Sequence, residues 1–92
     1  MAGNAKVYLG SVPDMAATDV KGMRLSGVHP GSPAEQGGMQ AGDVIVEFGG
    51  VAVTDIYSYS NALYAHKPGE VVKAVVLRDG KRVELTVTLG SR

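Results

Sequence analysis

Glycine and proline are so frequent in this chain that they restrict it to short helices and short strands. Thirteen glycines and four prolines occur within 92 residues, and both residue types interrupt regular structure. The runs between them are rich in valine and other residues that favour strands. Such a chain predicts one small domain of short strands joined by tight turns, with one or two short helices.

The second half of the chain predicts the clearest strands. Asp79-Gly80 is a strong two-residue hairpin turn. The valine-rich segment Glu70–Arg78 precedes this turn, and Lys81–Leu89 follows it with alternating apolar and polar residues. The apolar residues of the second strand share one face: Val83, Leu85, Val87 and Leu89.

The first half predicts shorter strands. They are expected at residues 6–9, 23–28, 44–48 and 51–53. Ser11–Asp14 can continue the first of them, although Pro13 lacks an N–H group and therefore belongs at the edge of a sheet. Residues 15–18 fit either a helical turn or a loop.

Two short helices are also expected. At the start of the first, Ser32 can act as the N-cap and Glu35 can complete a capping box, with Pro33 in the first turn. Gly37-Gly38 ends this helix after one or two turns.

The second helix is expected over Ile56–Ala65, with either Thr54 or Asp55 as its cap. Its larger apolar residues recur at helical spacing, at positions 56, 59 and 63. Because the connections are short, the strands must pair mainly antiparallel. We therefore expect a mainly β (α+β) fold, a partly open antiparallel barrel of about five or six strands capped by the two helices.

Charge and composition disfavour several classes of function. Nine lysine and arginine residues balance nine aspartate and glutamate residues, so no basic surplus is available for nucleic acid or an anionic membrane surface. Cysteine is absent, which excludes disulfides, thiolate metal sites and a cysteine nucleophile. No apolar run is long enough to span a membrane, and the first residues lack the apolar core of a signal peptide.

Candidate catalytic groups are few. The two histidines, His29 and His66, fall in a turn and at the end of the second helix. Ser26, His29 and Asp43 could be combined into a triad, but any chain of this size offers such triples, and the usual catalytic motifs are missing. No set of residues has the spacing of metal ligands. We expect neither an enzyme nor a metal or cofactor site.

Three tyrosines fall on the second helix, at positions 57, 59 and 64. Tyrosines can stack on nucleic-acid bases, but Lys67 is the only basic residue near them. Amphipathic packing is therefore favoured over nucleic-acid stacking as the explanation of these tyrosines.

Gly10 directly follows a strand-forming run and allows a tight bend of the backbone. Such a bend can point successive N–H groups outward as an anion-binding nest, and an edge strand after it can accept an extended peptide as an additional strand. A β-bulge at Gly10 explains the same residue without a ligand. The residues alone do not decide between these interpretations.

Several motifs together resemble a PDZ domain over most of the chain. Gly31–Ile45 is similar to the PDZ signature in which Gly-Ser-Pro-Ala precedes a Gly-Asp pair, and Tyr8-Leu9-Gly10 resembles the carboxylate-binding loop of bacterial PDZ domains. Lys67–Glu70 and Val76–Lys81 resemble the end of those domains. The motif order resembles the permuted topology of HtrA-type serine proteases and processing proteases, and Tyr8–Asp14 looks most like PDZ domains of secreted zinc aminopeptidases.

The resemblance implies a binding site built mainly from backbone groups. The N–H groups of Leu9, Gly10 and Ser11 would hold the terminal carboxylate of a ligand, and the strand from Ser11 would pair with the peptide. The second helix would line the other side of the groove, with Tyr59 equally well explained by core packing. The expected peptide-binding residues are Tyr8, Leu9, Gly10, Ser11, Val12, Ile56, Tyr59, Ser60 and Leu63.

Three residues depart from the family pattern. Ser11 stands where an apolar residue is usual, which predicts a shallow or partly polar pocket for the ligand's terminal side chain. Pro13 stands where the family offers an N–H to the ligand, so one hydrogen bond worth roughly 0.5–1.5 kcal/mol should be missing. Ile56 replaces a histidine, which favours an apolar residue two positions before the ligand's end. We expect affinity on the order of micromolar or weaker, about −8 kcal/mol at best.

Residues 1–92 are thus expected to form a single PDZ-like domain cut from a larger bacterial protease. The leading hypothesis is a non-catalytic module that binds C-terminal tails or exposed apolar peptide ends. The alternative is a docking or regulatory domain that packs on its parent catalytic domain and binds no free peptide. The resemblance also implies an extracytoplasmic location, periplasmic or secreted, and we expect a monomer without nucleic-acid or membrane partners and without cofactors.

Overall fold

The predicted valine-rich hairpin is the longest paired unit of the computed structural model, which describes residues 7–14 and 21–91. Strand β6 (Val71–Arg78) pairs along its full length with β7 (Lys81–Thr88). Between them, Asp79 and Gly80 have φ values of 52° and 79°. Two consecutive residues with positive φ are what a type I′ turn requires, so the predicted turn is confirmed.

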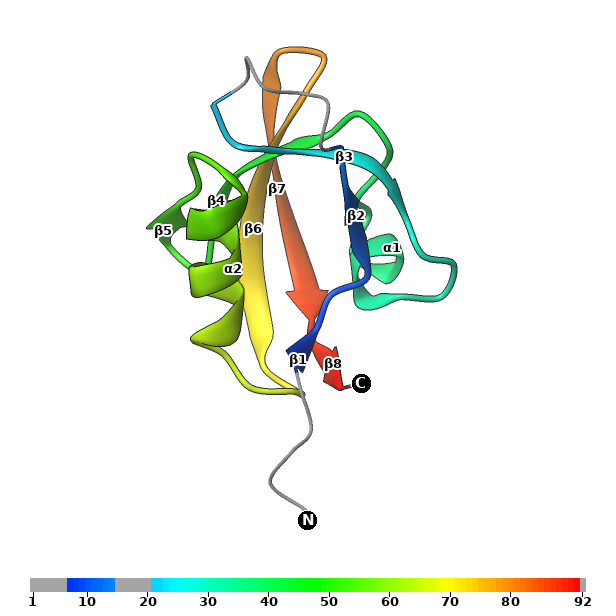
Figure 1. The fold of residues 1–92 in the computed structure, drawn as a ribbon. Coiled ribbons are helices and arrows are strands. Elements are labelled where there is room, and N and C mark those ends of the chain that lie inside the picture. The colour runs from blue at the N-terminus through cyan, green and yellow to red at the C-terminus, as the bar shows by residue number, and fades with distance from the viewer. Residues whose placement is uncertain (1–6, 15–20, 92) are drawn as a thin grey trace.

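The remaining strands of this sheet are β2 (Ser11–Pro13), β3 (Met23–Val28), β4 (Val44–Phe48) and β5 (Val51–Ala52). The sheet order is β2-β3-β4-β6-β7, with β5 paired to β4, and every pair is antiparallel. Strands β2 and β7 lie at opposite ends of this order, so the described strands form an open sheet and not a closed barrel (Figure 1). The prediction of a mainly β, antiparallel fold with two helices is confirmed.

The two ends of the described chain lie side by side in a small second sheet. Strand β1 (Val7–Tyr8) pairs antiparallel with β8 (Gly90–Ser91), as Figure 1 shows below the main sheet. Sequence analysis missed this pair because it ended the last strand at Leu89. Residue 6, expected in the first strand, and the expected turn or loop at residues 15–18 lie outside the described residues.

Helix α1 (Pro33–Gln36) packs on β7 and begins at the predicted cap. Ser32 Oγ accepts a hydrogen bond from the Glu35 N–H at 3.2 Å. The Glu35 carboxylate, however, accepts from the Gly31 N–H at 2.6 Å, because the Ser32 N–H already donates to the His29 carbonyl. The cap is therefore confirmed, whereas the reciprocal half of the capping box is shifted by one residue.

Helix α2 (Ile56–Tyr64) packs against β4 and flanks the sheet on the left of Figure 1. Asp55 is its N-cap and accepts from the Ser58 N–H at 2.8 Å, and the helix ends one residue before the predicted end. Within the described residues, no helix has both the length and the apolar character needed to cross a membrane.

The core lies between α2 and the sheet, and Phe48 is fully buried in it. The rings of Tyr59 and His66 meet Phe48 edge-on, with centroids 5.9 and 5.8 Å away. Of the three helix tyrosines, Tyr59 packs inward and the other two do not. Tyr57 is 76% exposed and Tyr64 is 66% exposed, because only one helical face can meet the sheet and Tyr59 occupies it.

An ion pair between the buried Asp43 and the partly buried Arg78 joins the residue before β4 to the end of β6. Asp43 is 1% exposed, and its two carboxylate oxygens accept from Arg78 Nε at 2.9 Å and Arg78 Nη2 at 2.7 Å. The same Nη2 donates to the Gly38 carbonyl, and the Gln40 N–H donates to Asp43. The hydrogen bonds from Arg78 to Asp43 raise the pKa of Arg78 above its ordinary value, so the guanidinium stays charged.

Replacing Arg78 by methionine should lower the free energy of unfolding by about 3–5 kcal/mol, because it leaves the buried Asp43 carboxylate without its counter-ion. Urea unfolding followed by circular dichroism measures this change. Arg82→Met is the matched control, because Arg82 pairs with Glu47 at the surface with its side chain 59% exposed and should cost about 1 kcal/mol or less. Equal effects of the two variants would contradict a structural role for the buried pair.

Candidate functional site

A groove of about 530 Å³ lies between the edge strand β2 and helix α2. It brings together eight of the nine residues expected to form a site: Tyr8, Leu9, Gly10, Ser11, Ile56, Tyr59, Ser60 and Leu63. Val12, the ninth, is not among the lining residues. Four further residues that sequence analysis did not place in the site also line the groove: Val7, Pro13, His29 and Tyr64.

The carbonyl groups of the loop between β1 and β2 accept hydrogen bonds that fix the loop on the side away from the groove. The Leu9 carbonyl accepts from the Ala34 N–H at 2.8 Å, and the Gly10 carbonyl accepts from the His29 N–H at 2.9 Å. In a trans peptide the carbonyl and the following N–H point in opposite directions. The N–H groups of Gly10 and Ser11 are therefore directed away from these partners, toward the groove that both residues line.

The N–H groups of this loop take no part in the turn and loop hydrogen bonds of the described residues. Among the turn and loop hydrogen bonds there, none is donated by the N–H of Leu9, Gly10 or Ser11. The bulge interpretation of Gly10 does not hold, since the irregularity of the β2–β3 register lies between Val12 and Pro13. Gly10 instead forms a bend with a φ of 86°.

The edge of β2 that faces away from β3 lacks one of the backbone N–H groups that a pairing strand would use, because Pro13 has none. Val12 and Asp14 direct their N–H groups toward β3, which follows from the antiparallel register and from the Asp14 N–H donating to the Arg24 carbonyl at 2.8 Å. Backbone groups alternate along a strand, so Ser11 and Pro13 face the open side. Ser11 presents both an N–H and a carbonyl there, but Pro13 presents only a carbonyl.

The same alternation explains why Val12 lies outside the groove. Its backbone faces β3, and its carbonyl accepts from Ser26 Oγ at 3.3 Å. Successive side chains of a strand point to opposite faces, so Val12 points away from the face on which Ser11 meets α2.

Helix α2 supplies the opposite wall. Its wall residues are Ile56, Tyr59, Ser60, Leu63 and Tyr64. Tyr59 is 5% exposed and its hydroxyl lies 2.8 Å from Ser11 Oγ, which links the helix to the strand. Burial raises the pKa of Tyr59 to about 12, so this hydroxyl keeps its proton at any physiological pH.

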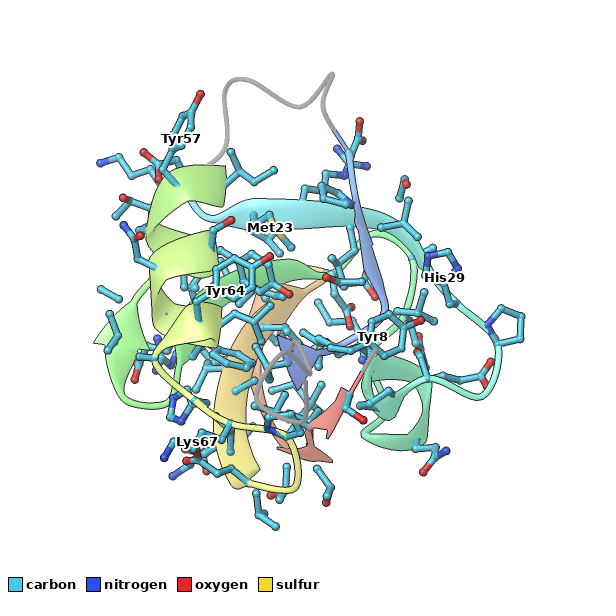
Figure 2. The ribbon with its side chains drawn as sticks, turned by 60° about the horizontal axis from the view of Figure 1, so that its bottom comes forward. Tyr8, Met23, His29, Tyr57, Tyr64 and Lys67 are labelled. Atoms are coloured by element: carbon cyan, nitrogen blue, oxygen red, sulfur yellow. The ribbon has the colours of Figure 1, made fainter. Side chains whose placement is uncertain are left out.

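Two of the missed residues stand at the rim of the groove. Figure 2 shows Tyr64 on the α2 side and Tyr8 and His29 on the opposite side, whereas Tyr57 projects away at the other end of the helix. Tyr64 could have been found, because it lies one helical turn after Ser60. His29 could not, because its position depends on the pairing of β3 with the loop before β2.

The described residues assemble no catalytic centre. Asp43 is engaged by Arg78, and Ser26 Oγ donates to a backbone carbonyl, so neither belongs to a triad with His29. No group of three acidic or histidine side chains that could hold a metal ion occurs in residues 7–14 and 21–91. The chemistry available in the groove is hydrogen bonding and apolar contact.

The sequence model of one protein family, the PDZ domain, matches residues 7–89. This chain belongs to the PDZ domain family. The matched residues include every segment on which the resemblance was based: Tyr8–Gly10, Gly31–Ile45, Lys67–Glu70 and Val76–Lys81.

Two curated relatives of this PDZ domain are bacterial serine proteases. The serine protease Do-like HtrA of Lactococcus lactis subsp. cremoris (strain MG1363) is 40% identical over 68 residues, which cover 74% of this chain and 17% of that protein. The probable periplasmic serine endoprotease DegP-like of Marinomonas sp. (strain MWYL1) is 39% identical over 71 residues, covering 77% of this chain and 15% of that protein. The chain therefore spans only about a sixth of the length of these relatives.

Solved structures agree with the HtrA-type resemblance. The HtrA-type protease AlgW with decapeptide superposes with a TM-score of 0.85 at 29% identity, covering 96% of this PDZ domain and 30% of that chain. An aminopeptidase N family protein from Idiomarina loihiensis superposes with a TM-score of 0.81 over 94% of this domain and 14% of that chain. Its sequence identity is 23%. This likeness therefore shows a shared fold and does not support the narrower resemblance to aminopeptidase-linked domains.

Replacing Gly10 by alanine should destabilise this domain more than the same change at Gly31. Both glycines have positive φ, 86° and 73°, and alanine in this region costs about 1–2 kcal/mol. At Gly10 the new Cβ would also lie 2.2 Å from Ser32 Cβ, whereas at Gly31 it would meet nothing within 4 Å. We expect the overlap to add about 1–3 kcal/mol in urea unfolding. Equal destabilisation would mean that the loop relaxes freely and is not fixed against Ser32.

Proposed function

We propose that this PDZ domain is a non-catalytic module of a bacterial protease that binds the C-terminal tails or exposed apolar ends of peptides by strand addition. The observation that carries the proposal is the alignment of free backbone groups along one groove. The N–H groups of Gly10 and Ser11 are turned away from the loop's internal partners, and the Ser11 carbonyl lies next to them on an unpaired strand edge.

A terminal carboxylate suits the loop end of this groove. Consecutive backbone N–H groups form concave sites for anions without any basic side chain, and the described residues that line the groove include no lysine or arginine. The peptide would then run antiparallel to β2, with its last N–H donating to the Ser11 carbonyl. Ile56, Ser60 and Leu63 would contact its side chains, with Tyr8 and Leu9 beside the carboxylate.

The relatives support this function and extend it to the parent protein. A protease named as binding a decapeptide shares the fold and 29% of the sequence, and a relative named as periplasmic is 39% identical. We accordingly place the domain in a protease that acts outside the cytoplasm, in the periplasm or secreted, where it would present peptide ends to the parent catalytic domain. We expect the isolated domain to be monomeric.

The first test compares two N-acetylated hexapeptides ending in alanine, one with a free C-terminal carboxylate and one with a C-terminal amide. Hydrogen bonds to a charged group contribute about 1.5–3 kcal/mol, so amidation should weaken binding by about tenfold or more. Isothermal titration calorimetry with the isolated domain measures both affinities. Equal affinity would remove the carboxylate site from the proposal.

The second test adds the missing donor of the strand edge. Pro13→Ala supplies an N–H opposite the third residue from the ligand's end, and one net hydrogen bond should tighten binding about twofold to tenfold. Pro68→Ala is the control, because Pro68 lies in the exposed turn after α2 and does not line the groove. A gain in the control, or none in the Pro13 variant, would contradict antiparallel pairing along β2.

A second function is favoured by the same proline. An edge strand that lacks one donor is a poor partner for long peptides, so the groove could instead dock on the parent catalytic domain and bind no free tail. A library of peptides with randomised C-termini distinguishes the two functions, because the docking function predicts that none of them binds.

A further inference from the structure

A hydrogen bond between two hydroxyl groups crosses the groove where the ligand's last side chain would lie. Ser11 Oγ on β2 and Tyr59 Oη on α2 are 2.8 Å apart. Two hydroxyls contain two O–H donors, and their mutual bond uses one. In the described part of the chain neither oxygen has another hydrogen-bond partner, so one O–H and several lone pairs remain for a molecule in the groove.

The position of this pair relative to the free amides decides which ligand residue meets it. A peptide whose carboxylate accepts from the Gly10 and Ser11 N–H groups, and whose last N–H donates to the Ser11 carbonyl, has its final residue directly opposite Ser11. Residues opposite one another in a ladder direct their side chains to the same face. The final side chain therefore points toward Ser11 and Tyr59, with Leu9 and Leu63 as the apolar part of the same lining.

Resting on the peptide-binding function proposed above, we infer that the Ser11–Tyr59 hydroxyl pair makes this domain select peptides whose last residue is small and carries a hydroxyl group. Threonine is the best match, with serine next, and valine or larger apolar residues are disfavoured.

Two physical effects produce this selectivity. An apolar side chain placed over the pair would shield the remaining O–H from water without replacing its hydrogen bond, which is unfavourable for any buried polar group. A threonine hydroxyl accepts that hydrogen bond, while its methyl group contacts Leu9 or Leu63. Large apolar side chains are further disfavoured because the Ser11–Tyr59 hydrogen bond joins β2 to α2 and limits the depth of the groove at this position.

Neither hydroxyl of the Ser11–Tyr59 pair ionises near neutral pH. Burial raises the pKa of Tyr59 to about 12, so its hydroxyl remains a neutral donor and does not become an anion that would repel the ligand carboxylate. The serine hydroxyl does not ionise in this range either, so both members of the pair stay neutral.

The test uses two N-acetylated hexapeptides that differ only in ending in threonine or valine, which have nearly the same shape. The unaltered domain should bind the threonine peptide about threefold to tenfold more tightly, the effect of one net hydrogen bond. A double variant, Ser11→Val with Tyr59→Phe, removes both hydroxyls and should reverse the preference. Tyr57→Phe, which removes an exposed hydroxyl from the same helix, should leave the preference unchanged.

The outcomes separate this inference from the function on which it rests. If both peptides bind only with a free carboxylate and valine is bound as tightly as threonine, the inference is overturned and the peptide-binding function stands. If neither peptide binds, or amidation has no effect, both fail. The comparison in the unaltered domain remains decisive even if the double variant does not fold, which thermal unfolding would reveal.

Discussion

The orientation of the free N–H groups in the groove depends on two hydrogen bonds on the opposite side of the β1–β2 loop. The Ala34 and His29 N–H groups bind the carbonyls of Leu9 and Gly10, and because each peptide unit is planar and trans, these bonds also set the direction of the next N–H. The loop can lie this close to α1 only without a side chain at Gly10, where a Cβ would overlap Ser32. Because Gly10 has no side chain, the connection between β1 and β2 can direct the N–H groups of Gly10 and Ser11 toward the groove.

Helix α1 can hold that loop only if the helix itself is fixed. It has four residues, too few for a helix to persist by its own hydrogen bonds. Its N-terminus is capped by Ser32, and just after its C-terminus the Gly38 carbonyl is bound by Arg78, which also pairs with the buried Asp43. A chain of contacts therefore runs from the end of β6 through α1 to the loop, so the buried ion pair supports the groove without lining it.

Local signals made much of this fold predictable. The turn at Asp79-Gly80, the cap at Ser32 and the helix over residues 56–64 each follow from a few neighbouring residues, and eight of the nine expected site residues line the groove. Other features depend on relations across the sheet. The strand pair at the two chain ends and the position of His29 depend on which distant segments pair, and neighbouring residues do not determine that.

Two of the three departures from the family pattern, Ser11 and Pro13, act together on selectivity. With no donor at Pro13, the strand edge would give a bound peptide fewer backbone hydrogen bonds, and backbone bonds do not distinguish one sequence from another. A larger share of the binding free energy must then come from the carboxylate and the final side chain. In the proposed binding mode that side chain would meet the hydroxyls of Ser11 and Tyr59, and a polar site that must be satisfied rejects the wrong ligand more strongly than an apolar one does. Even a weak binder of this kind would therefore discriminate between ligands at the last residue.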